Sequence, residues 1–347
     1  MRFYTQPHQY DCGIDLHARS LYLCILDQGG ALVLHRHRAA APEPFCGPLL
    51  PTAPIARSPW KTSSPGTGWL TFVRKQGMAF VRGPALYMQA LHGGQAKNDP
   101  IDAHTVAVWR RGGLIPQAYG YPAEKRATRD RLRRRNPLLR ERAPLLAPIQ
   151  NTNSPDHLPE IGKTIADQTN RGGVAERFAE PSVPKRIEVD RALIATHDPL
   201  LTELELYRVN TAKRHDANAF YRLRSVLGIG KILALVRLDE IDDLQRFPRV
   251  QDVVSDGRLV KCAKESAGKR SGTSGQTIGN AHLQWAFSEA VVLFLRNNPQ
   301  GPKYRARLER RHGQGQALTV LAHKRARAIY YRLKRATAFD RNQFLAG

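Results

Sequence analysis

Residues near the N-terminus form short apolar, β-prone runs that turns and polar residues separate. Residues 10–15, 20–27 and 31–35 are rich in β-prone side chains, and Gln28-Gly29-Gly30 provides a tight turn between the last two runs. The pattern predicts a three-stranded β-meander. Sheets of the ribonuclease-H type begin in this way, but a hairpin alone does not define one fold.

Prolines interrupt this pattern between residues 45 and 68. Five of them lie among Ser, Thr and Gly without a sustained period: Pro48, Pro51, Pro54, Pro59 and Pro65. Because proline lacks the N–H that a β-ladder needs, we expect no central strand in this segment. Regular structure is expected to resume with a strand at residues 78–81, a short helix at 86–91, and a helix at 102–111 that Gly112-Gly113 ends.

Two long charged stretches in the middle of the chain, residues 124–150 and 185–215, have helical patterns. Three prolines are expected to kink or split the first helix: Pro137, Pro144 and Pro148. On the second helix, apolar residues recur at the spacing of a helix-pairing stripe: Leu193, Leu200, Leu204 and Tyr207. Two interpretations remain open, a solvated helical hairpin and a dimerising coiled coil.

The remaining residues, 216–347, have mainly helical patterns. Helices are predicted at residues 220–227 and 232–241, around Gly228-Ile229-Gly230-Lys231, and again at 281–295 and 317–334. Glycines let a backbone approach phosphate closely, and the N-terminus of the following helix offers free N–H groups. Gly228, Gly230 and Lys231 are therefore candidate nucleic-acid contacts, although an ordinary turn between two helices explains the same residues.

The charge balance indicates a polyanionic partner. The 347 residues include 54 Lys and Arg against 30 Asp and Glu, a formal net charge of +24. So large an excess points to DNA or RNA, and we find no basic amphipathic anchor or long apolar span that would favour a membrane. No signal segment precedes the first strand, so we expect the protein to stay inside the cell. The four cysteines show no C-x-x-C pairing, which argues against a zinc ribbon or a disulfide framework.

Residues 264–280 (KESAGKRSGTSGQTIGN) are rich in Ser, Gly and basic side chains. Such a segment is expected to be a flexible basic loop, and Lys264, Lys269 and Arg270 are candidate contacts to DNA phosphate. A serine hydroxyl can also attack a phosphodiester while neighbouring cations stabilise the charge. His282 is the first histidine after the loop, so the base that would activate such a serine is not evident from the sequence.

A few carboxylates stand out against this basic background. Asp15 is the one charge inside an apolar strand, and Asp99 and Asp102 are three apart, so they share a helix face. Converging carboxylates are the oxygen ligands that Mg²⁺ prefers and that metal-dependent nucleases use. Asp99 at the N-cap with Pro100 behind it would equally make a good helix start, so capping stays open. A fourth acid on a middle strand is missing, because Glu43 is the one acid between Asp27 and Asp99.

Four segments in this order resemble the transposases of insertion-sequence family 110, subgroup 1111: GIDLHARSLYLCILD, ALHGGQAKNDPIDAHTVA, RSVLGIGKILAL and ESAGKRSGTSGQTIGNAHLQWA. The resemblance implies an α/β plus α architecture. A RuvC-like ribonuclease-H domain is expected at residues 1–118, disrupted at about 45–75. A helical coiled-coil linker would follow at 119–215, and a mainly α transposase domain with a helix-hairpin-helix at 216–347.

The resemblance also implies chemistry. Family members are DNA recombinases with an Asp-Glu-Asp-Asp site for Mg²⁺, a nucleophilic serine and a guide RNA encoded by the element. By their positions in the matching segments, Asp15, Asp99 and Asp102 resemble the family's metal ligands. Ser266 resembles the family's nucleophilic serine, and Ser271 and Ser274 are the other candidates for that role. A homo-oligomer, dimeric or higher, is implied, acting on DNA in the bacterial cytoplasm at the nucleoid. Asp99 can then cap the helix and bind metal together.

The second acid departs from the family pattern. Family members have a Glu in an apolar strand where this chain has IARSPWKTSSPGTGW, and we hypothesise that compensating frameshifts rewrote this segment. A degenerate transposase that binds nucleic acid without cutting it is therefore an alternative. A Holliday-junction-type nuclease that uses the metal site alone is another, and a basic architectural protein is a third.

Overall fold

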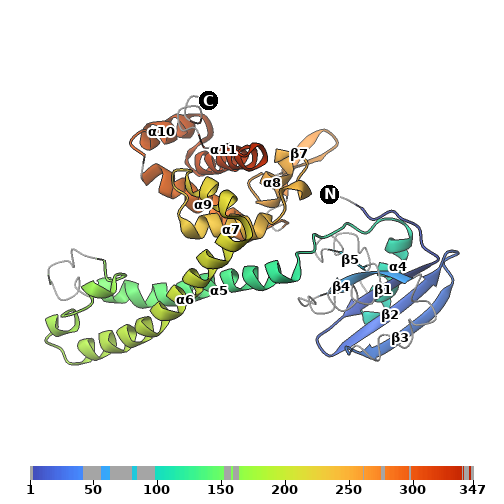
Figure 1. Ribbon diagram of the computed structural model, residues 1–347, viewed down its shortest axis with the longest axis horizontal. Helices are drawn as coiled ribbons and strands as arrows, with labels where there is room; N and C mark the ends of the chain where they lie inside the picture. Colours follow the sequence, from blue (N-terminus) through green and yellow to red (C-terminus); the bar gives the residue numbers. More distant parts are fainter. Residues whose placement is uncertain are drawn as a thin grey trace. The chain divides into compact units, whose positions relative to one another are not determined.

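The computed structural model describes residues 3–41, 56–62, 80–83, 98–151, 158, 164–260, 262–274, 278–296, 298–337, 339 and 344. The chain divides into two compact units, Met1–Ala123 and Glu124–Gly347, each of which is described by itself (Figure 1). The predicted helix at residues 86–91 lies outside the described residues. No described helix combines the length and apolar character that crossing a membrane requires.

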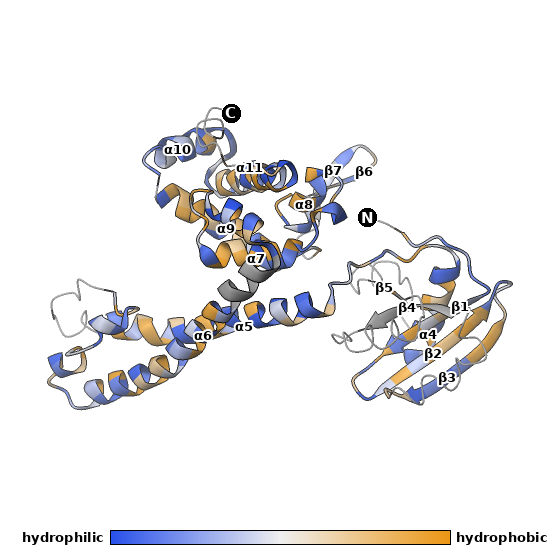
Figure 2. Ribbon diagram, viewed as in Figure 1, coloured by the Kyte–Doolittle hydropathy of each residue, from blue (hydrophilic) through white to orange (hydrophobic). Residues whose placement is uncertain are grey.

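The first unit is built on a mixed sheet with the strand order β3-β2-β1-β4-β5. The predicted meander is confirmed as β1 (Tyr10–Leu16), β2 (Ser20–Asp27) and β3 (Leu32–Ala39), paired antiparallel. Strand β2 is mostly apolar and buried, whereas β3 begins with apolar residues and continues with basic ones (Figure 2). The remaining strands, β4 (Ala56–Thr62) and β5 (Phe80–Arg82), run parallel to β1.

The expectation that the proline-rich segment supplies no central strand is wrong for β4. This strand lies between β1 and β5 with Pro59 inside it. A proline removes one N–H donor from the ladder, and pairing with β1 continues on both sides of it, with Arg57 opposite Asp11 and Trp60 opposite Ile14. The loss of one N–H donor therefore does not prevent the other residues of β4 from pairing with β1.

Helix α4 (Asp99–Arg111) packs on the sheet and ends at Gly112, as predicted. Its N-cap is Asn98, whose Oδ1 accepts a 2.9 Å hydrogen bond from the backbone N–H of Ile101. The interpretation of Asp99 as the N-cap is therefore wrong, because the amide side chain one residue earlier takes that place. The close approach of β1 to α4 requires Gly13, since a Cβ there would overlap the carbonyl oxygen of Ala103.

The second unit begins with two long helices, α5 (Ala123–Asn151) and α6 (Ser182–Arg224). Between them lie the 3₁₀ turns η1 (Gln168–Asn170) and η2 (Ala175–Arg177). A small core joins both helices to η2 and its neighbours: Ile149, Ile165, Val174, Ala175, Phe178, Ile187 and Ile194. Charged pairs also link α5 to α6, with 2.6 Å between Arg135 Nε and Glu205 Oε1. Helix α6 departs from helical dihedrals at Asp216, where φ is −156° and ψ is 83°.

The predicted splitting of α5 is wrong, because one helix runs through all three prolines: Pro137, Pro144 and Pro148. The prolines are seven and four residues apart, so they share one face of the helix. Two of them, Pro144 and Pro148, are exposed. Water can therefore reach that side of the helix, where hydrogen-bond donors are missing.

Six further helical segments follow α6 in the described part of the second unit: α7 (Lys231–Ile241), η3 (Leu244–Arg246), α8 (Val250–Asp256), α9 (Ala281–Arg296), α10 (Gly301–His312) and α11 (Gln314–Arg335). They enclose the largest apolar core, to which α9 contributes Leu283, Phe287 and Phe294. Between α8 and α9 the chain forms a two-stranded hairpin, β6 (Cys262–Ser266) and β7 (Lys269–Ser274). The expected flexible loop is therefore largely a hairpin.

Candidate metal centre and serine-bearing hairpin

Asp15 lies near the end of β1, in the middle of the sheet, and is almost fully buried. Its neighbours across the ladders are Tyr22 on β2 and Lys61 on β4. Because β1 is hydrogen-bonded to a strand on each side, its backbone is held in place at Asp15, and this limits the positions that the carboxylate can take.

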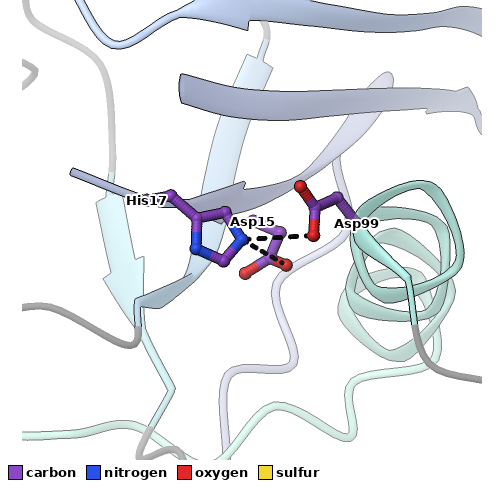
Figure 3. Close-up of side chains that lie close together, drawn as sticks. All are labelled: Asp15, His17 and Asp99. Carbon is purple, nitrogen blue, oxygen red and sulfur yellow. Dashed lines mark hydrogen bonds and ion pairs between the residues drawn. The ribbon is translucent and has the colours of Figure 1, made fainter. Parts of the chain in front are cut away.

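Three side chains gather at this end of β1 (Figure 3). His17 Nε2 lies 3.4 Å from Asp15 Oδ2 and 3.2 Å from Asp99 Oδ1. Asp99 comes from the first turn of α4, whose N-cap is supplied by Asn98, so its carboxylate is directed to His17 rather than to the helix end. The structure therefore brings together two residues that are 84 positions apart in the sequence, Asp15 and Asp99.

The spacing of these atoms fits a shared divalent ion. The ligand atoms of Asp15, His17 and Asp99 all lie within 4.8 Å of one another. Adjacent ligands of an octahedral ion with bonds of about 2.1 Å are about 3 Å apart, and opposite ones about 4.2 Å. The same contacts also suit an imidazole of His17 that meets both carboxylates directly, without an ion. The geometry thus supports a metal site without identifying the ion.

Asp102 lies one turn further along α4 and is buried. It does not belong to the three-residue group that the described residues form, so its role as a ligand stays a prediction. His17 was not among the predicted ligands. The sequence signal was present, because residues two apart on a strand project from the same face, and Asp15 and His17 have this spacing.

The missing second acid has a structural counterpart in β4. This strand (ARSPWKT) contains no Asp or Glu, and the residue whose Cα is paired with that of Asp15 is Lys61. The strand next to Asp15 therefore carries a basic residue at the register position paired with Asp15.

The two glycines of the turn before α7 have different roles. Gly228 has a φ of 82°, and a Cβ there would lie 2.7 Å from the backbone nitrogen of Phe294, so this glycine allows the turn to pack on α9. The buried Arg325 holds the same turn through a 2.6 Å hydrogen bond to the carbonyl oxygen of Leu227. Gly230 is the N-cap of α7 and has open space around it, and Lys231 is exposed. The first turn of α7 is thus accessible to an anion.

Ser266 is exposed at the tip of the hairpin, where its Cα is paired with that of Lys269. The turn between them has positive φ at both positions, 49° at Ala267 and 73° at Gly268. Ser271 is exposed on β7, and Ser274 ends that strand opposite Cys262. A hydroxyl on a two-residue turn next to a lysine is reachable by a phosphate group.

A buried polar network at the base of the hairpin was not predicted. Glu240 on α7 is 1 % exposed and contacts Arg129, Arg133 and Asn280. Burial by itself raises the pKa of Glu240, but hydrogen bonds from Arg133 and the charges of both arginines outweigh it and lower the pKa to about 2. Sequence reasoning missed this network because its members are far apart along the chain.

A comparison with curated proteins found no match. Residues 221–306 match the family model of the transposase IS116/IS110/IS902 family. The matched segment runs from the end of α6 through α7, the hairpin and α9 into α10. It covers less than half of the 347 residues and includes Gly228, Gly230 and Ser266. The match supports an IS110-type transposase and with it a role in binding DNA.

Proposed function

We propose that the protein is an insertion-sequence transposase that cleaves and rejoins DNA through Ser266 and a divalent metal. The observation that carries this proposal is the family match over residues 221–306, within which Ser266 is the exposed serine at the tip of a hairpin. The paired carboxylates of Asp15 and Asp99 in the first unit add the chemistry that such a reaction needs.

In this proposal Asp15, His17, Asp99 and Asp102 hold Mg²⁺. When bound, the ion would neutralise phosphate charge and favour loss of the hydroxyl proton. Oγ of Ser266 forms a bond to phosphorus as the bond to the leaving DNA oxygen breaks, and that oxygen takes up a proton. Rejoining reverses this exchange on another strand. Lys269, opposite Ser266 in the hairpin, would stabilise the phosphate charge.

The nucleic-acid contacts of the proposal lie on the same unit. Gly230 and Lys231 would present the first turn of α7 to a backbone phosphate in the manner of a helix-hairpin-helix, with Gly228 setting the turn. Lys264 and Arg270 would act beside Lys269. A guide RNA encoded by the element is part of the proposal through the family resemblance.

A second copy of the chain is part of the proposal as well. Two members of the apolar stripe on α6, seven residues apart, are solvent-exposed: Leu193 (46 %) and Leu200 (45 %). The ring of Tyr207 instead lies against the guanidinium of Arg131 on α5, 4.3 Å from it. Ile187 and Ile194 on the same helix are buried in the α5–α6 core instead. A seven-residue repeat that the chain does not bury internally suits pairing with the same helix of another copy.

One observation favours a competing function. Because β4 has no carboxylate and places Lys61 opposite Asp15, the metal site is short of one negative charge. A degenerate transposase that binds nucleic acid without cutting it is the alternative that this favours. A Holliday-junction-type nuclease would use the metal site without Ser266.

The deciding experiment is a search for a covalent protein–DNA link. The full-length protein is incubated with end-labelled element DNA, the element's transcript and Mg²⁺ or Mn²⁺, and label that stays on the protein is measured under denaturing conditions. We expect a link that Ser266→Ala abolishes and that Ser271→Ala, in the same hairpin, preserves. Cleavage that survives Ser266→Ala would indicate the simple nuclease.

The degenerate alternative has its own outcome. Wild type would bind DNA without cutting or linking to it. Lys61→Glu, which adds a carboxylate at the position opposite Asp15, would then increase Mn²⁺ affinity in calorimetry, with Lys125→Glu in the second unit as the control.

A further inference from the structure

Glu240 joins three separate parts of the second unit. Its Oε2 accepts hydrogen bonds from Arg129 Nε at 2.7 Å and from Asn280 Nδ2 at 2.7 Å. Arg133 donates through Nε to Oε1 at 2.8 Å and through Nη2 to Oε2 at 2.9 Å. The two arginines lie on α5 and Glu240 lies on α7, whereas Asn280 directly precedes the first residue of α9. A buried carboxylate with this many charged and polar partners is held in one position.

Asn280 closes the segment that contains the serine hairpin. Its backbone N–H donates to the carbonyl oxygen of Asp256, at the end of α8. One residue earlier, the carbonyl oxygen of Gly279 accepts two hydrogen bonds from the guanidinium of Arg258, at 3.0 and 2.8 Å. Both ends of the stretch between Asp256 and Asn280 are therefore tied together at one point, and the side chain of Asn280 binds Glu240 at that point.

The geometry points to a positioning role for Glu240. We propose that Glu240 couples helix α5 to the base of the hairpin that carries Ser266, so that the orientation of the hairpin depends on the α5 arginines. The reactive role of Ser266 rests on the proposed function, but the coupling does not. Helix α5 is also where the chain enters the second unit from the first, so the coupled helix is the one that continues from the metal-bearing unit.

Hydrogen exchange of the full-length protein, measured by mass spectrometry, tests the coupling without requiring activity. The decisive variant is Arg133→Gln, because Arg133 lies on α5 and binds Glu240 but has no described contact to the hairpin. Its side chain is 34 % exposed, so the variant is expected to fold. The matched control is Arg135→Gln on the same helix, which removes one positive charge and a 2.6 Å bond to Glu205 on α6.

We expect exchange in residues 262–274 and 278–283 to rise about tenfold or more in Arg133→Gln and to stay unchanged in Arg135→Gln. Glu240→Gln should reproduce the Arg133→Gln pattern. In the covalent-link assay, Arg133→Gln should lower the rate at saturating DNA and leave the half-saturating DNA concentration unchanged.

Two results would overturn the coupling. If Arg133→Gln sped up hydrogen exchange in α5 but not in the hairpin, Glu240 would hold α5 in place without affecting the hairpin. Equal effects of Arg133→Gln and Arg135→Gln would assign the change to lost charge rather than to Glu240. A wild-type protein that forms no link to DNA would instead contradict the proposed function and leave the exchange result intact.

Discussion

Glu240 carries a negative charge where water has almost no access. Burial raises its pKa, yet Arg129 and Arg133 more than compensate, so the folded pKa is about 2 against a usual value of 4.5. A carboxyl group whose pKa is depressed by folding stabilises the protein above its unfolded pKa, and this stability is lost as the pH falls through the folded pKa. The shift corresponds to roughly 3 kcal/mol.

We therefore expect the difference in free energy of unfolding between wild type and Glu240→Gln to shrink by roughly 3 kcal/mol as the pH falls from about 5 to about 2. Urea unfolding followed by circular dichroism at several pH values measures this difference. Glu205→Gln, which alters a more exposed pair with Arg135, is the control and should show little pH dependence relative to wild type. A constant difference between wild type and Glu240→Gln across this range would contradict the assignment.

Ala267 adopts a backbone conformation that suits glycine, with a φ of 49° in the turn after Ser266. The left-handed region costs an L-residue roughly 1–2 kcal/mol. Glycine avoids this cost, but its greater freedom in the unfolded state offsets part of the gain in stability. We expect Ala267→Gly to slow hydrogen exchange in the hairpin about fivefold, since about 1 kcal/mol corresponds to that factor. Ala263→Gly, in the adjoining strand β6, should have the opposite effect, and equal effects of the two changes would refute the explanation.

Local sequence patterns were sufficient to predict some helices and strands but not those whose pairing depends on distant parts of the chain. The β1–β3 meander, α4 and α9 were predicted because their strands and helices depend on nearby residues. A central strand was not expected among the five prolines of residues 45–68, but the pairing of β4 with β1 and β5 depends on contacts distant in sequence. The approach of Asp99 to Asp15 through His17 depends on the same long-range packing. Asp102 and Ser266 stay predictions as functional residues.

The contact between β1 and α4 places Asp15 and Asp99 together. A Cβ at position 13 would lie 2.5 Å from the backbone nitrogen of Ala107, which leaves no side chain able to move aside. We expect Gly13→Ala to destabilise the first unit by at least about 2 kcal/mol and to abolish Mn²⁺ binding in calorimetry. Gly112→Ala is the control, because a Cβ there meets nothing closer than 3.5 Å. Unchanged metal affinity in Gly13→Ala would show that the close packing does not position the site.

The exposed stripe on α6 gives a prediction for assembly. Leu193→Glu together with Leu200→Glu should convert the proposed oligomer to a monomer in analytical ultracentrifugation, because charges in a helix-pairing seam repel. Leu206→Glu changes an exposed leucine on the same helix outside the seven-residue repeat and should leave the oligomer intact. A double variant that assembles like wild type would exclude this face as the interface.

For the whole molecule, charge decides how nucleic acid is held. A net charge of +24 implies that many phosphates are neutralised on binding. We expect DNA affinity, measured by fluorescence anisotropy, to fall about 100-fold or more between about 50 and about 200 mM salt, with a similar slope for unrelated DNA of equal length. A nearly flat dependence would mean that the basic surface does not face the phosphates.

Hydrogen bonds from Asn280 to Asp256 and from Arg258 to Gly279 join the two ends of the stretch that carries the hairpin, and Leu259 near its start packs in the apolar core. Because the chain leaves and returns at one point, a hairpin of different length or sequence can be substituted there without disturbing the register of α8 or α9. Replacing this stretch by a hairpin of another sequence would exchange the proposed nucleophile Ser266 together with its neighbouring basic side chains. Variation in this hairpin is then compatible with an unchanged arrangement of the surrounding helices.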